Sequence, residues 1–155
     1  MMKKKDLNIL LADDDTDDCI FFKVALDDLA IKTNLTTVHD GEQLMIYLDE
    51  TAREFIDVLF LDINMPRKNG FECLTEIRQN EKLKDLPVII FSTSYEQEVV
   101  NSLYKSGAHY FIRKPSDFAQ FKKIIYYTLL LIVQEQISPP SKANFVLTVD
   151  NSFID

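Results

Sequence analysis

The chain has 155 residues, a length that suits one domain with a full hydrophobic core. Hydrophobic residues make up 46% and charged residues 27%, which is typical of a folded globular protein and excludes a disordered one. The formal net charge of -8 argues against nucleic-acid binding, which needs clustered lysine and arginine. Since no apolar run is long enough for a membrane span or a signal peptide, we expect a cytoplasmic protein.

Short apolar runs alternate along the chain with segments of helical periodicity. Continuous apolar runs are typical of strands that are buried on both faces, as in a parallel sheet covered by helices. The alternation therefore predicts a doubly wound α/β fold with five strand–helix pairs. In chain order, the predicted elements are a strand at 7–12, a helix at 16–31, a strand at 34–41, a helix at 42–52, a strand at 57–63, a helix at 70–80, a strand at 86–94, a helix at 95–107, a strand at 108–115 and a helix at 116–136.

The first predicted strand ends in the acidic segment LLADDDTDD, residues 10–18. Asp13 and Asp14 follow the strand directly, and Asp15 or Thr16 is expected to cap the next helix. Acids at this position suit the positive N-terminal end of a helix. They also suit a cation site, and the segment by itself does not distinguish the two.

Polar residues also follow the third, fourth and fifth predicted strands. Each has an ordinary interpretation when taken alone, such as a loop acid, a capping hydroxyl or a surface lysine. In an open parallel sheet, however, the carboxyl ends of all strands meet at the edge where ligands bind. Clustered carboxylates at that edge suit a hard cation such as Mg²⁺. The residues expected to meet there are Asp13, Asp14, Asp62, Asn64, Ser92 and Lys114.

These positions carry a resemblance to the response-regulator receiver domains of two-component signalling. The matching motifs are LLADDD (10–15), LFLDINMPRKNG (59–70), LPVIIFSTS (86–94) and GAHYFIRKP (107–115), and the element order extends the match to about residues 7–136. The resemblance implies an α/β, flavodoxin-like (βα)5 receiver fold, a five-stranded parallel sheet with the strand order 2-1-3-4-5.

The resemblance also assigns roles to the residues at the strand ends. Asp62 would be the phosphoacceptor, a carboxylate nucleophile that forms an aspartyl phosphate. Mg²⁺ (or Mn²⁺) would be held by Asp13, Asp14, Asp62 and the backbone carbonyl of Asn64. Lys114 would pair with a phosphoryl oxygen.

Two further positions correspond to the conformational switch of such domains. Ser92 would hydrogen-bond the phosphoryl group, and Phe111 would be the aromatic residue that follows the movement. Threonine is common at the first position and tyrosine at the second, so the hydroxyl is kept at Ser92 and lost at Phe111. The remaining acids of the first motif, Asp15, Asp17 and Asp18, are assigned to the helix start.

The implied organisation is a receiver domain at residues 1–137 and a C-terminal tail extension at 138–155. Because no output domain is recognised after the last helix, we expect a stand-alone response regulator that signals through partner binding. Its phosphoryl group would come from a sensor histidine kinase or a histidine phosphotransfer protein. The protein would not be an enzyme beyond self-catalysed phosphotransfer and autodephosphorylation.

Two other functions compete with this prediction. A phosphohydrolase with an aspartate nucleophile and Mg²⁺ would need threonine or valine where Asp17 stands, and it would leave Asp62 unexplained. A receiver-like binding module that is never phosphorylated would not need its acid pair together with Asp62, Ser92 and Lys114.

The last predicted helix contains the segment IIYYTLLLIV (124–133), in which Thr128 is the only residue that is neither apolar nor aromatic. A surface helix normally keeps one polar face. Either the tail segment NFVLTV (144–149) covers the outer side of this helix, or the fourth and fifth helices form a homodimer interface or a kinase-docking surface.

Overall fold

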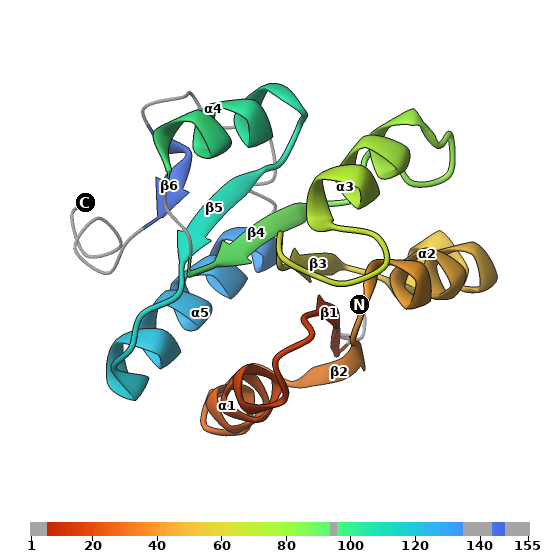
Figure 1. Cartoon of the computed structure of the whole chain (residues 1–155). Coiled ribbons are helices and arrows are strands. Elements are labelled where there is room, and N and C mark those ends of the chain that lie inside the picture. Colours follow the sequence, from red (N-terminus) through yellow and green to blue (C-terminus); the bar gives the residue numbers. More distant parts are fainter. Residues whose placement is uncertain (1–5, 94–95, 135–143, 148–155) are drawn as a thin grey trace.

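Strands and helices alternate along the chain in the computed structural model, which describes residues 6–93, 96–134 and 144–147 (Figure 1). The strands are β1 (Leu7–Ala12), β2 (Thr33–Val38), β3 (Val58–Leu61), β4 (Val88–Ser92), β5 (Tyr110–Arg113) and β6 (Val146–Leu147). The helices are α1 (Thr16–Asp27), α2 (Gly41–Glu50), the 3-10 helix η1 (Arg53–Phe55), α3 (Gly70–Gln79), α4 (Gln97–Lys105) and α5 (Phe118–Val133).

The strands form one parallel sheet in the order β2-β1-β3-β4-β5-β6. The chain passes from β1 to β2 on one side and then returns to β3 on the other side of β1. In sheets of this kind, ligands bind at the carboxyl edge next to such a reversal of strand order. The fold class predicted from the sequence is therefore confirmed, with β6 as an additional strand.

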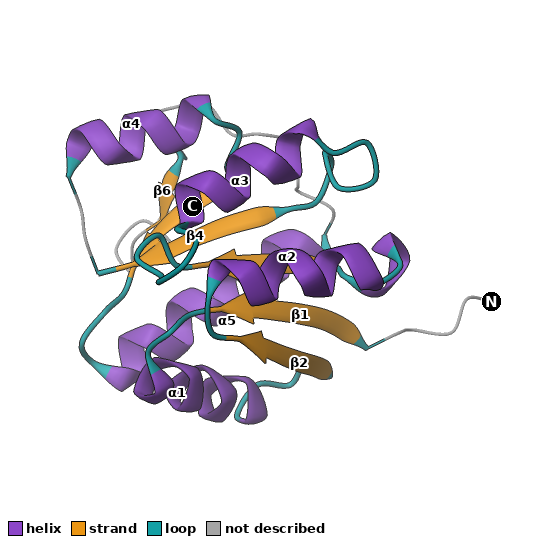
Figure 2. Cartoon of the chain, turned by 45° about the vertical axis from the view of Figure 1, so that its right-hand side comes forward, coloured by secondary structure: helices purple, strands orange, loops and turns teal. Residues whose placement is uncertain are grey.

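Helices cover both faces of the sheet, with α1 and α5 on one face and α2, α3 and α4 on the other (Figure 2). Successive side chains of a strand point to opposite faces. Ile9 and Leu11 therefore pack in the core on the α1 side, while Leu10 and Ala12 pack in the core on the α3 side. Every residue of β3 and β4 is buried, which explains why these strands are continuous apolar runs.

Helix α1 is held against the sheet by a buried aromatic group. The Phe22 ring meets the rings of Phe60, Phe91 and Phe121 at centroid distances of 4.9, 5.9 and 6.4 Å, each in an edge-on arrangement. Edge-to-face pairs of this kind favour a defined ring orientation in addition to the burial of area. The rotation of α1 about its axis is thus set by Phe22, four residues after Asp18.

The structure confirms the ten predicted elements and moves several of their ends. Helix α1 ends at Asp27, four residues before the predicted end. Of the two caps considered for it, Asp15 is the one used, since its side chain accepts a hydrogen bond from the backbone N–H of Asp18. Helix α5 is capped by Asp117, whose side chain accepts from the N–H of Gln120.

Strand β6 was not predicted, and it lies beyond the predicted domain end at residue 137. Its neighbour Phe145 is 1% exposed and packs edge-on against Tyr104 of α4, with 5.2 Å between the ring centroids. Leu147 is buried on the α5 side. The segment therefore folds back beside β5 rather than over the outer side of α5, where Tyr126 remains exposed. The domain boundary itself stays a prediction.

Helix α5 is the most apolar of the helices in the described residues, and it is only 16 residues long. Thr128 faces the core, where its hydroxyl donates a hydrogen bond to the carbonyl oxygen of Ile124 at 2.8 Å. No helix in the described part of the chain combines the length and the apolar character needed to cross a membrane.

Candidate functional site

Backbone hydrogen bonds continue one residue beyond three strands and hold the polar residues that follow them. These bonds extend the parallel ladders, so the Cα positions of the polar residues are as well defined as those of the sheet. The bonds run from Asp13 N to Val38 O at 3.0 Å, from Asp62 N to Ala12 O at 2.9 Å and from Lys114 N to Ser92 O at 2.9 Å. The sheet thereby brings together residues that are far apart in the sequence.

The loop after β3 returns closely over the end of that strand. A Cβ atom added to Gly70 would lie 2.5 Å from the carbonyl oxygen of Asp62, so only glycine fits at this first position of α3. Asn69 caps α3 in a reciprocal arrangement with Glu72, in which each side chain accepts a hydrogen bond from the backbone of the other. The turn therefore holds the backbone of Asp62 and Asn64 next to the start of α3.

Three carboxylates gather at the carboxyl edge of β1 and β3. Asp13 is fully buried and Asp62 is 7% exposed, while Asp14 is open to solvent. One oxygen from each lies within 4.8 Å of the other two. The backbone N–H of Asn64 donates to Asp62 Oδ1 at 3.3 Å, which holds the backbone of Asn64 beside this carboxylate. A set of carboxylate and carbonyl oxygens with one solvent-facing member is the type of site that Mg²⁺ or Mn²⁺ prefers.

Lys114 lies within the same group of acids. Its Nζ is 2.6 Å from Asp13 Oδ2, 2.7 Å from Asp18 Oδ2 and 3.7 Å from Asp62 Oδ2. It also lies 5.2 Å from the centroid of the Phe91 ring. Burial by itself would lower the pKa of Lys114, but its hydrogen bonds to Asp13 and Asp18 outweigh that effect and raise it. Lys114 is therefore a fully charged ammonium at neutral pH.

Asp18 lies in the first turn of α1, as predicted, and its side chain also contacts Lys114. The sequence does contain a signal for this contact, because Asp18 precedes the apolar Phe22 by four residues and lies on the same face of α1. The sheet-facing side of the first turn thus carries Asp18, while Asp17 is exposed.

The electrostatic environment of Asp62 makes its negative charge less favourable than it is in water. Burial raises the pKa of Asp62 to about 7, the positive charge of Lys114 opposes this, and the negative charge of Asp13 adds to it. Two buried carboxylates beside one ammonium leave excess negative charge. The site is therefore complementary to a divalent cation.

This raised pKa predicts a pH-dependent effect of Asp62→Asn on stability without metal. The pKa in the unfolded chain is about 4, so the folded state binds the extra proton, and this stabilisation is present below pH 4 and lost as pH rises to 7. We expect the variant to be more stable than the wild type by roughly 2–4 kcal/mol at pH 8 and by about 1–2 kcal/mol at pH 5.

Urea denaturation in EDTA at the two pH values measures this difference. Asp49→Asn removes an exposed acid of α2 and serves as the matched control, for which we expect no pH-dependent gain. A gain for Asp62→Asn that is equal at pH 5 and pH 8 would contradict the raised pKa.

The two predicted switch residues lie at the end of β4 and in β5. Ser92 and Phe111 are both fully buried. Ser92 is the last residue of its strand, where it pairs with Arg113 in the register of the sheet and accepts a backbone hydrogen bond from Lys114. The backbone N–H of Phe111 donates to the carbonyl oxygen of Phe145 at 3.0 Å, so the predicted switch strand also carries β6.

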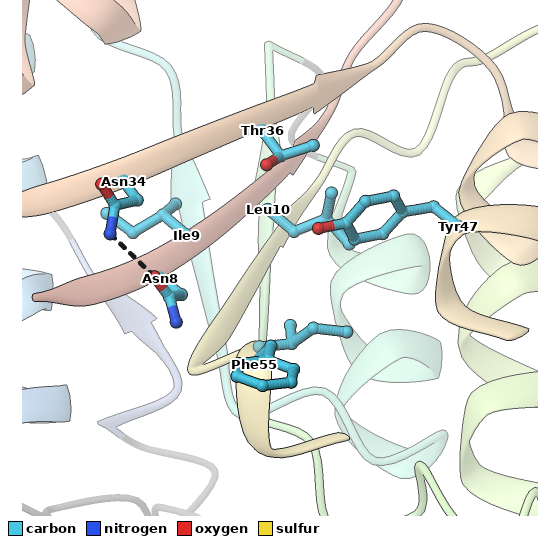
Figure 3. Close-up of a pocket in the computed structure, with 8 residues that line it drawn as sticks. Asn8, Ile9, Leu10, Asn34, Thr36, Tyr47 and Phe55 are labelled. Carbon is cyan, nitrogen blue, oxygen red and sulfur yellow. Dashed lines mark hydrogen bonds between the residues drawn. The ribbon is translucent and has the colours of Figure 1, made fainter. Parts of the chain in front are cut away.

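A hollow of about 230 Å³ lies at the other end of the sheet (Figure 3). Asn8 and Asn34, near the amino ends of β1 and β2, line it and are joined by a 3.1 Å hydrogen bond. Tyr47 and Phe55 form its other walls. Its lining includes no carboxylate, imidazole or amine, so it does not compete with the carboxyl edge as a reactive site.

Known proteins share both the sequence pattern and the fold. The family profile described as response regulator receiver domain matches residues 9–126. Response regulator Rcp1 of Synechocystis sp. is 28% identical over 121 residues, which cover 76% of this chain and 82% of Rcp1. The Mn²⁺-bound structure of Rcp1 superposes with a TM-score of 0.73 at 26% identity and covers 87% of this chain and 99% of that one.

A second solved structure is similar over an even larger share of the chain. The phosphorylated cyanobacterial phytochrome response regulator RcpA gives a TM-score of 0.76 at 27% identity and covers 88% of this chain and all of that one. Receiver domains are signalling proteins rather than enzymes; histidine kinases or phosphotransfer proteins phosphorylate them, and their acidic pocket binds Mg²⁺ or Mn²⁺. With its profile match, its sheet order and its acidic edge, this chain belongs to the response regulator receiver domain family.

Proposed function

We propose that this protein is a stand-alone response regulator that accepts a phosphoryl group on Asp62 and signals by binding a partner protein. The observation that carries the proposal is the convergence of Asp13, Asp14 and Lys114 around the Asp62 carboxylate at the end of β3. Similarity to Rcp1 and RcpA over nearly their whole lengths supports the stand-alone form.

In the proposed reaction, an oxygen of Asp62 attacks the phosphorus of a phosphohistidine on a kinase or phosphotransfer protein. The new P–O bond replaces the P–N bond, and the imidazole leaves with the bonding electrons and takes up a proton. Lys114 stabilises the negative phosphoryl oxygens. Ser92 donates its hydroxyl hydrogen to the transferred group, and Phe111 follows the resulting movement of the β4 end.

Asp13, Asp14, Asp62 and the carbonyl of Asn64 would hold the metal ion. When bound, Mg²⁺ or Mn²⁺ supplies positive charge that offsets the charge on the transferring phosphoryl group. Rcp1, whose solved structure contains Mn²⁺, supports this part of the proposal.

Labelling with a small phosphodonor tests the proposal and separates it from a binding module that is never phosphorylated. We expect the wild-type protein to gain the mass of one phosphoryl group after incubation with acetyl phosphate and Mg²⁺, and to gain none when EDTA replaces the metal. Intact-mass spectrometry measures both results. Unchanged mass in the presence of Mg²⁺ would refute phosphorylation as the function.

We also propose a surface through which two copies of the protein bind each other. A homodimer through α4 and α5 is supported by Tyr126 and Val133, which are 39% and 43% exposed on α5. Residues 145–147 already occupy the space beside β5, so such an interface would use the exposed sides of the two helices rather than the β5 edge. The cytoplasmic location also stays a prediction.

A further inference from the structure

Asp18 lies in the first turn of α1, as predicted, and also has a contact that the sequence analysis did not predict. Its side chain is 24% exposed, and its Oδ2 is 2.7 Å from Lys114 Nζ, almost as close as Asp13 Oδ2 at 2.6 Å. It is not part of the group of three carboxylates that could hold a metal ion. Asp18 therefore contacts Lys114 without belonging to the candidate metal site.

The geometry gives this contact a consequence for Asp62. A lysine ammonium has three N–H donors, and Asp13 and Asp18 accept from two of them. Lys114 Nζ stays 3.7 Å from Asp62 Oδ2, beyond hydrogen-bond distance. Asp18 thus holds the ammonium on the α1 side of the site, where it forms an ion pair with Asp62 at 3.7 Å but no hydrogen bond.

We propose that Asp18 is a positioning residue that keeps Lys114 from closing onto Asp62. The inference rests on the proposed function. Without Asp18, the ammonium would move from 3.7 Å to hydrogen-bond distance of Asp62 while it keeps its bond to Asp13. That pairing would occupy the oxygen that attacks phosphorus, and it would also compete with a cation for Asp13 and Asp62.

Variants of two neighbouring acids distinguish the effect of the Asp18–Lys114 contact from the effect of removing one negative charge. Asp18→Ala removes the contact, whereas Asp17→Asn removes the same charge from an exposed site on the same turn. We expect Asp18→Ala to slow labelling by acetyl phosphate roughly tenfold. Mg²⁺ binding, measured by calorimetry, should weaken by a similar factor, because residues in direct contact influence one another's interactions. Asp17→Asn should change either quantity by less than about twofold.

A double-mutant cycle with Lys114→Ala tests whether Asp18 acts through the lysine. In the Lys114→Ala background, we expect Asp18→Ala to alter Mg²⁺ affinity and the residual labelling rate by less than about twofold. Asp18→Asn, which keeps an oxygen acceptor for Lys114, should recover part of the loss and provides a second variant if alanine disturbs folding.

The outcomes distinguish this inference from the proposed function. A wild-type protein that does not gain phosphoryl mass would overturn the function. A wild type that labels normally, with Asp18→Ala equal to Asp17→Asn, would overturn only the role of Asp18. The role of Asp18 would also be overturned if Asp18→Ala reduced the labelling rate and the Mg²⁺ affinity equally in the wild-type and the Lys114→Ala backgrounds. That result would show that Asp18 does not act through the lysine.

Discussion

Asp62→Asn is expected to abolish labelling by acetyl phosphate completely. The amide lacks the carboxylate oxygen that attacks phosphorus, and no other carboxylate has the same place at the end of β3. The side chain is nearly isosteric, so the site should keep its shape. Intact-mass spectrometry after incubation with the donor and Mg²⁺ measures the result.

The matched control for this loss is Asp49→Asn, an exposed acid of α2 that should label like the wild type. Peptide mapping of the labelled wild type should place the phosphoryl group in the segment that contains Asp62. An Asp62→Asn protein that gains phosphoryl mass at the wild-type rate would remove Asp62 from its proposed role.

Phe145→Ala is expected to cause a large loss in the free energy of unfolding. Phe145 is 1% exposed and packs against Tyr104, so the substitution leaves a cavity between β6 and α4. Large-to-small changes at buried phenylalanines cost about 3–5 kcal/mol. Detachment of the short strand limits the loss, so we expect about 3 kcal/mol in the free energy of unfolding.

Urea denaturation measures this loss, and Val146→Ala in the same segment is the control. Val146 is only partly buried, so about 1 kcal/mol is expected for it. A chain that ends at Gln136 lacks the whole segment and should expose the β5 edge, which favours self-association. Light scattering at several concentrations would then show a larger mass for the truncated chain than for the full one. Equal stability of Phe145→Ala and the wild type would mean that β6 contributes nothing to the fold.

The sequence by itself determined the fold class and the members of the acidic site. Strands such as β3 and β4 are covered on both faces, so their residues are apolar without interruption and are recognisable from local composition. Parallel strands share one carboxyl edge, so the polar residues that follow them must meet. Asp13, Asp62 and Lys114 were therefore predictable as neighbours before any distance was known.

Only the tertiary structure decided which acids of the first motif have a specific contact. Asp17 and Asp18 are adjacent acids in the first turn of α1, and although Asp18 shares a helix face with Phe22, the sequence does not show which way that face turns. Their difference depends on the rotation of α1, which the packing of Phe22 against three other rings sets. The raised pKa of Asp62 likewise depends on burial by segments that are distant in the sequence.

Strand β6 is the clearest case of a feature that local pattern could not predict. It has two residues, too few for the alternation that identifies a strand, and it pairs with β5 more than 30 positions earlier in the chain. Its stability comes from Phe145 and Leu147, which fill space on the two faces of the sheet beside β5. This strand forms because β5 offers an unpaired edge and because the hydrophobic core on each face of the sheet has space beside that edge. Both conditions are properties of the assembled fold.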